Sequence, residues 1–103
     1  MGFAGRRAAA VARTELSVPL PYQVYLRQTV IEFLEPLDYW ERLRVLDFCE
    51  RLGQQPFRDG DFTERGADGR DVQVAILGPY ALVWWVDSAV CEVKVVTLRP
   101  ADI

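Results

Sequence analysis

Apolar and polar positions alternate along the last third of the chain, and this pattern predicts three β-strands. The strands cover residues 69–77, 80–87 and 91–99, which are rich in Val, Ile, Leu and Trp. Turn residues separate them, with Gly78-Pro79 in the first gap and Asp87-Ser88 in the second. Because strands joined by such short turns pair with each other, the pattern predicts an antiparallel meander.

Helical spacing marks the stretch before the meander, and two helices are expected there. The first runs from about residue 27 to residue 35 and ends at Pro36. Asp38 is expected to cap the second helix, since Glu41 three residues later completes a capping arrangement. Gly53 is the expected C-cap. The two helices form a hairpin that must pack on the sheet.

The second helix is expected to bury a broad apolar face. One stripe of that face is formed by Trp40, Leu43, Leu46 and Cys49, and it is widened by Val45, Phe48 and Leu52. Trp40 is expected at the interface between helix and sheet. The carboxylates of this helix are spaced among arginines, as on a solvated face, which argues against acid–base or metal chemistry there.

The remaining segments complete an α+β domain. A short strand is expected at residues 22–26, and a polar loop with room for one turn of helix at residues 54–68. The order of elements is then β-α-α-β-β-β, with a helical hairpin packed on one face of a small, mainly antiparallel sheet. The other face stays open, and it is the natural place for a site.

The chain is divided into an N-terminal arm, residues 1–21, which is expected to be flexible, and a domain, residues 22–103. Pro19 and Pro21 keep the end of the arm extended. The arm carries arginines around a run of five small apolar residues, which is too short for export or for crossing a bilayer. Two interpretations stay open: an arm that the fold does not need, and a basic arm that contacts a partner.

Composition and charge narrow the classes of function. The chain has 103 residues with 50% hydrophobic content, enough for one domain with its own core. Its net charge of −3 and its pI near 4.9 count against nucleic-acid binding unless positive charge is concentrated locally. The acids lie mostly in the helical part, because residues 32–61 hold eight acids and four arginines. Two cysteines cannot form a disulfide framework, so a reduced, cytoplasmic protein is expected.

The order of elements and four segments together resemble a known family. The segments are Leu52-x-x-x-Pro56, Gly69-Arg70-Asp71-Val72, Tyr80-x-Leu82-Val83-Trp84 and Val93-Lys94-Val95-Val96-Thr97-Leu98. Over about residues 22–102 the chain resembles the RelE/ParE superfamily, the toxins of bacterial type II toxin–antitoxin modules, which include plasmid stabilisation proteins. The resemblance implies either messenger-RNA endonuclease activity, on the ribosome or free of it, or inhibition of DNA gyrase. It also implies a cognate antitoxin that wraps the toxin, and a homodimer is left open.

The chain departs from the nuclease members of that family where catalysis is concerned. Those members place basic side chains near the end of the second strand and directly after the Tyr of the third, and a Tyr or His near the C-terminus. This chain has Ile76-Leu77 and Ala81 at the first two places, and residues 98–103 contain neither Tyr nor His. RNA cleavage needs a proton acceptor, a cation for the phosphate and an acid for the leaving oxygen. Only the cation has candidates, so ribonuclease activity stays open and no catalytic residue is assigned.

Arg70, Lys94 and Arg99, together with Tyr80, are the candidate contacts for a phosphate group or a target. Strand alternation could bring two of the three cations to one face. The alternative is that each forms an exposed ion pair, which contributes only about 0–1 kcal/mol. The partners expected in such pairs are Asp68 or Asp71 for Arg70, Glu92 or a group on a neighbouring strand for Lys94, and Asp102 for Arg99.

Trp84 and Trp85 are the candidate partner contacts. Adjacent strand residues point to opposite faces, so one indole must leave the helix-covered side of the sheet. One tryptophan is expected in the core. The other is expected either to stack on a neighbouring strand or to form a hot spot for a partner. The sequence has no His and no Cys pair at ligand spacing, so neither a metal nor a cofactor is expected.

The resemblance, together with the missing nuclease positions, implies a toxin that binds and inhibits a target such as DNA gyrase and is neutralised by a cognate antitoxin. Two alternatives are kept. One is a messenger-RNA endonuclease with an atypical site built from Arg70, Lys94 and Tyr80, which would have the ribosome or messenger RNA as its partner. The other is an inactive relative that retains only partner binding. No membrane partner is expected.

Overall fold

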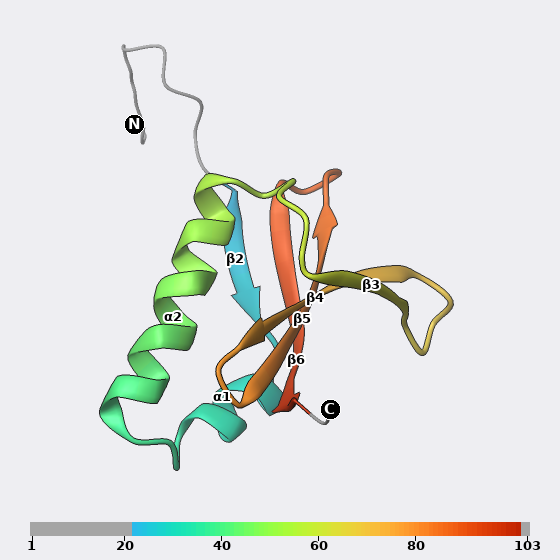
Figure 1. Cartoon of the computed structure of the whole chain (residues 1–103). Helices are drawn as coiled ribbons and strands as arrows, with labels where there is room; N and C mark the ends of the chain where they lie inside the picture. The colour runs from blue at the N-terminus through green and yellow to red at the C-terminus, as the bar shows by residue number, and fades with distance from the viewer. Residues whose placement is uncertain (1–21, 102–103) are drawn as a thin grey trace, which may run out of the picture.

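A five-stranded sheet forms the centre of the computed structural model, which describes residues 22–101 (Figure 1). The strands are β2 (Gln23–Leu26), β3 (Phe62–Arg65), β4 (Asp71–Leu77), β5 (Tyr80–Asp87) and β6 (Glu92–Pro100). They lie in the order β2-β6-β5-β4-β3, with β2 parallel to β6 and the other neighbouring pairs antiparallel. The predicted meander is confirmed as β4, β5 and β6. The arm expected at residues 1–21 lies outside the described residues.

Two helices, α1 (Gln28–Leu34) and α2 (Tyr39–Gln54), pack on one face of this sheet. Figure 1 shows α2 running alongside β2. Asp38 caps α2, because its Oδ1 accepts a hydrogen bond of 2.9 Å from the backbone N–H of Glu41. The predicted α+β class, helical hairpin and cap are therefore confirmed.

Gly53 does not end α2, contrary to the prediction. The helix continues to Gln54, and Gln55 is its C-cap. A Cβ atom at Gly53 would lie 2.8 Å from the carbonyl oxygen of Tyr22 and 3.1 Å from Cγ2 of Val24. Glycine is required here because α2 packs closely on the chain at β2, and not because the helix needs a left-handed cap.

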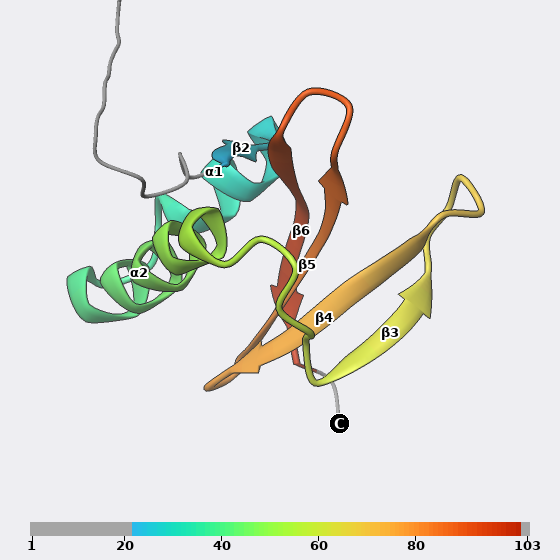
Figure 2. The same ribbon diagram turned by 90° about the horizontal axis from the view of Figure 1, so that it is seen from above.

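The segment predicted as a loop, residues 54–68, contains the edge strand β3, so the observed order is β-α-α-β-β-β-β. This strand pairs with β4 from Phe62 opposite Val74 to Arg65 opposite Asp71. Its side chains are mostly exposed, and the run Phe-Thr-Glu-Arg does not alternate between apolar and polar residues. The hydrophobic pattern therefore carries no signal for this strand. In Figure 2 the hairpin of β3 and β4, called here the β3–β4 hairpin, extends away from the helices.

The buried face of α2 differs in part from the expected one. The side chains that α2 buries include those of Val45, Phe48, Cys49 and Leu52. By contrast Trp40 is 71% exposed, and Leu43 and Leu46 are exposed as well. Apolar residues occupy both sides of the helix, so periodicity alone could not tell which side meets the sheet. The expectation that Trp40 packs between helix and sheet is wrong.

The sheet face away from the helices is less open than expected, because it carries an apolar cluster of its own. Val72, Val74, Ala81 and Val83 are buried there, separately from the core under the helices. The pairing of β5 with β6 shifts by one residue between Val83 and Trp84, which marks a bulge. A bulge increases the local twist, and Figure 2 shows how far β3 and β4 are rotated relative to β6. The twisted sheet therefore shelters part of its second face.

Candidate functional site

A groove of about 360 Å³ lies on the face of the sheet away from the helices. Its apolar lining comes from the apolar cluster of this face, called here the second cluster. Val72 and Val83 belong to that cluster, and Trp85 and Val96 pack on it. Its polar lining includes four arginines and two carboxylates, namely Arg27, Arg65, Arg70, Arg99, Glu64 and Asp68. The groove therefore concentrates positive charge locally on a chain whose net charge is negative.

Arg99 is one of the predicted cations and lies in the groove near the end of β6. It pairs in register with Ala81 of β5, whose side chain belongs to the second cluster. Its Nη2 lies 2.9 Å from Oε2 and 3.2 Å from Oε1 of Glu64, on β3. Both side chains are about two-fifths exposed. Asp102, the partner expected for Arg99, lies outside the described residues.

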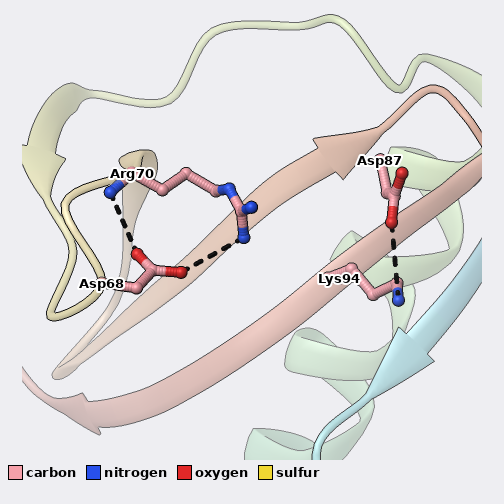
Figure 3. Close-up of polar contacts among 4 residues, drawn as sticks. All are labelled: Asp68, Arg70, Asp87 and Lys94. Atoms are coloured by element: carbon pink, nitrogen blue, oxygen red, sulfur yellow. Dashed lines mark hydrogen bonds and ion pairs between the residues drawn. The ribbon is translucent and has the colours of Figure 1, made fainter.

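Arg70 lies in the turn of the β3–β4 hairpin, on the same groove. Its Cζ is 3.7 Å from the centre of the Trp85 ring, so the guanidinium stacks on the indole. Its Nη1 is 3.2 Å from Oδ2 of Asp68, and its backbone N–H donates a bond of 3.0 Å to Oδ1 of the same residue (Figure 3). The predicted pair of Arg70 with Asp68 is thus present.

Lys94 lies on the same face of the sheet but does not line the groove. It pairs in register with Trp85, and its Nζ is 5.8 Å from the centre of that ring. Its charge is paired with two carboxylates, 3.2 Å from Oε1 of Glu92 and 3.7 Å from Oδ2 of Asp87, the second of which Figure 3 shows. The structure therefore brings Arg70 and Arg99 together in the groove, with Lys94 outside it.

Tyr80 faces the opposite side of the sheet from these cations. Its ring packs edge-on against Phe33 of α1, 5.7 Å between centroids, and its hydroxyl donates a bond of 3.0 Å to Oε2 of Glu41 on α2. Desolvation, followed by the bond to Glu41 and the charges of Glu41 and Asp38, raises the pKa of the Tyr80 hydroxyl above its ordinary value. Tyr80 holds a helix to the sheet and does not share a site with Arg70 and Lys94.

The fold has counterparts among solved structures, although no family model and no curated protein matches the chain. A chain of the archaeal RelE–RelB complex from Pyrococcus horikoshii OT3 is 24% identical, with a TM-score of 0.66 over 78% of this chain and 94% of that chain. A chain of the toxin–antitoxin complex RelBE2 from Mycobacterium tuberculosis is 23% identical, with a TM-score of 0.65 over 78% of this chain and 98% of that one. This chain has a RelE-like fold.

The RelE-like fold separates the tandem tryptophans as strand alternation predicts. Trp84 is completely buried under the helices and packs on Phe48, 5.6 Å between ring centroids. Its Nε1 has no hydrogen-bond partner among the residues that the structure describes. Trp85 is partly exposed on the other face, where it lines both the groove and a second hollow of about 370 Å³. Of these two tryptophans, Trp85 is the one whose ring a partner could reach.

Sequence reasoning missed several groove residues that the RelE-like fold assembles. Arg27 reaches the site because its backbone N–H bonds to the carbonyl oxygen of Val95, which continues the pairing of β2 with β6. Glu64 and Arg65 reach it through β3, a strand that the pattern did not reveal. The one available signal was the pair of glycines at 66 and 69, since glycine is common in hairpin turns and Gly69 has φ of +83°.

Within residues 22–101, no group of three or more His, Cys, Asp or Glu side chains could hold a metal ion. Over the same range, none of the helices has the length and apolar character needed to span a bilayer.

Proposed function

We propose that this chain is the toxin of a type II toxin–antitoxin module. In this proposal it acts in the cytoplasm by binding and inhibiting a target such as DNA gyrase, and a cognate antitoxin neutralises it. The observation that carries the proposal is the likeness to RelE toxins found in complexes with RelB, at a TM-score of 0.66 and across 94% of that chain. The groove, which lies on the face that the helices leave free, is the proposed contact surface for the target.

Binding is favoured over cleavage because, among the described residues, neither a tyrosine nor a histidine lines the groove beside its arginines. Tyr80 lies on the helix side of the sheet, bonded to Glu41. Arg70 and Arg99 are each within 3.2 Å of a carboxylate, and the sequence contains no histidine. An endonuclease would need an oriented proton acceptor near the phosphate. A binding protein needs only a complementary surface.

The test is induced expression of the full chain in bacteria with three readouts from the same culture: growth, integrity of messenger RNA, and supercoiling of a plasmid. Growth arrest with intact messages and relaxed plasmid supports gyrase inhibition. Co-expression of the protein encoded by the neighbouring gene should restore growth if that protein is the antitoxin. Unimpaired growth at high expression would contradict toxicity and favour an inactive relative that retains partner binding.

A second candidate function is a messenger-RNA endonuclease with an atypical site. The observation in its favour is the gathering of four arginines in one groove, since guanidinium groups bind phosphates well. Arrest accompanied by cleaved messages would support this candidate and contradict the proposal that the toxin acts by binding alone. In that case Arg70 and Arg99 would be the first residues to replace.

A further inference from the structure

The groove combines an apolar lining with a charged one, and this combination suits a particular class of ligand. Val72, Val83 and Val96 supply apolar contact area, while Arg27, Arg70 and Arg99 supply guanidinium groups. We propose that the groove binds a short acidic peptide segment of a protein partner, with apolar side chains on the valines and carboxylates on the arginines. This inference rests on the proposed function, because it states the chemistry of the partner that the same groove would take.

The molecule's own carboxylates show that the arginines of the groove are placed for such a ligand. Both carboxylate oxygens of Glu64 accept hydrogen bonds from Nη2 of Arg99, at 2.9 and 3.2 Å. Asp68 meets Arg70 at 3.2 Å. Both carboxylates come from the β3–β4 hairpin, and the four side chains are between 38% and 62% exposed. Exposed pairs of this kind are weak, so a ligand carboxylate can replace either partner at small cost.

Three observations favour a peptide over a nucleic acid as the ligand. The chain carries a net charge of −3, which repels a long polyanion but not a short segment whose charge stays within the groove. The valines suit aliphatic side chains better than a sugar–phosphate backbone. In addition, Arg70 covers a face of the Trp85 ring at 3.7 Å, so that face is not free to stack on a base.

The hairpin carboxylates act as competitors of the ligand in this account. Glu64 holds Arg99 while the groove is empty, and a partner must displace it. Neutralising Glu64 removes the competitor and should therefore strengthen binding, whereas removing Arg99 should weaken it. A general effect of net charge predicts the same two signs, so the distinction comes from repeating both charge changes at an ion pair outside the groove.

The experiment measures fluorescence anisotropy of a labelled peptide, about ten residues long, that alternates glutamate and leucine, with the full chain as titrant. Arg99→Ala should weaken binding by about tenfold, the effect of losing one charge-assisted hydrogen bond. Glu64→Gln should tighten binding by about threefold. Arg70→Ala provides a second test at the other pair, in case Arg99→Ala does not fold.

Matched controls come from the exposed pair of Arg51 with Asp47 on α2, whose atoms lie 2.7 Å apart outside the groove. Arg51→Ala and Asp47→Asn repeat the same charge changes and should leave binding unchanged. The inference is overturned if these controls act like the groove variants, if a peptide with glutamine in place of glutamate binds equally well, or if the acidic peptide does not bind. Tighter binding of an oligouridylate of similar length would also overturn it and assign the groove to RNA.

The failure of this inference is distinguishable from the failure of the proposed function. Growth arrest by a protein that does not bind the acidic peptide would leave the toxin proposal intact and remove only the peptide site. Peptide binding that depends on Arg99, in a protein whose expression leaves growth unchanged, would keep the site and contradict toxicity.

Discussion

On strand β5, the position of each residue in the alternation decides whether its side chain reaches the helices or the groove. Tyr80 and Trp84 turn toward the helices, whereas Trp85 turns toward the groove. Strand alternation predicted that the two indoles would part. It could not predict which one enters the core, because alternation does not say which face of the sheet the helices cover. Because the helices cover the face that carries Tyr80, its side chain lies away from Arg70 and Lys94, with which it was predicted to share a site.

The two cysteines should differ sharply in reactivity. Cys49 is buried in the core, and its burial raises the pKa of its thiol to about 12, while Cys91 is exposed in the turn before β6. Only thiolate reacts, so a thiol reagent near pH 8 should label Cys91 quickly and Cys49 only on unfolding. The measurement is mass spectrometry of the native chain, with Cys91→Ser as the control. Rapid labelling of Cys49 in that variant would contradict the buried position.

The same thiol gives stability a dependence on pH at the alkaline end. Burial raises the pKa of the Cys49 thiol from its ordinary value of 9.0 to about 12 in the folded chain. The thiol loses its proton at a lower pH in the unfolded chain than in the folded chain. The contribution of Cys49 to the free energy of unfolding is therefore fully present below pH 9 and is lost as the pH rises toward about 12. Urea unfolding above pH 9 should therefore show a steeper loss of stability in the wild type than in Cys49→Ala. Equal slopes would contradict the raised pKa.

Tyr80→Phe separates a structural role from a catalytic one. The change removes the hydroxyl bonded to Glu41 and should slightly lower the midpoint of thermal unfolding. Growth arrest by the protein should persist, since the ring lies on the side of the sheet away from the groove. Loss of arrest by a variant that remains folded would return Tyr80 to the functional site.

At the level of elements, α2 shows where hydrophobic periodicity reaches its limit. The helix and its cap at Asp38 could be predicted, because local capping chemistry and spacing are enough for both. The orientation of the helix could not be predicted, since Trp40, Leu43 and Leu46 form an apolar stripe as good as the buried one. The side of α2 that faces the sheet is determined by its contacts with β2 and β6, and these contacts join residues far apart in the sequence.

A pair of alanine substitutions tests the orientation of α2. Leu52 is fully buried, so Leu52→Ala should lower the free energy of unfolding by about 2–5 kcal/mol. Leu43 is 43% exposed, so Leu43→Ala should cost less than about 1 kcal/mol. Urea unfolding measures both changes on the same scale. Equal losses, or a larger loss at Leu43, would contradict the exposed position of Leu43.

The cap of α2 gives a second test at this scale. Asp38→Ala removes the acceptor of the 2.9 Å bond from the Glu41 N–H and should cost about 1 kcal/mol. Asp47→Ala, which breaks only an exposed pair with Arg51, should cost about 0.5 kcal/mol or less. The difference between the two variants in urea unfolding measures the cap itself, and similar losses would argue against it.

At the level of the whole molecule, the groove is a product of topology. Its lining comes from the end of β2, the β3–β4 hairpin, β5 and β6, which are brought together by the sheet order β2-β6-β5-β4-β3. From the sequence, strand alternation allowed two of the three cations Arg70, Lys94 and Arg99 to share a face, but it could not say which two. It could not predict Arg27 or Glu64, since one depends on parallel pairing across the chain and the other on an edge strand without a hydrophobic pattern.

The most direct measurement of the central claim is growth after induced expression of three full-length proteins: the wild type, Arg99→Ala and Arg51→Ala. The two variants lose the same charge, one inside the groove and one outside it. With equal accumulation of protein in all cultures, the account predicts that the wild type and Arg51→Ala arrest growth with intact messenger RNA while Arg99→Ala does not. Arrest by Arg99→Ala, or cleaved messages in the wild-type culture, would contradict a toxin that acts by binding through the groove.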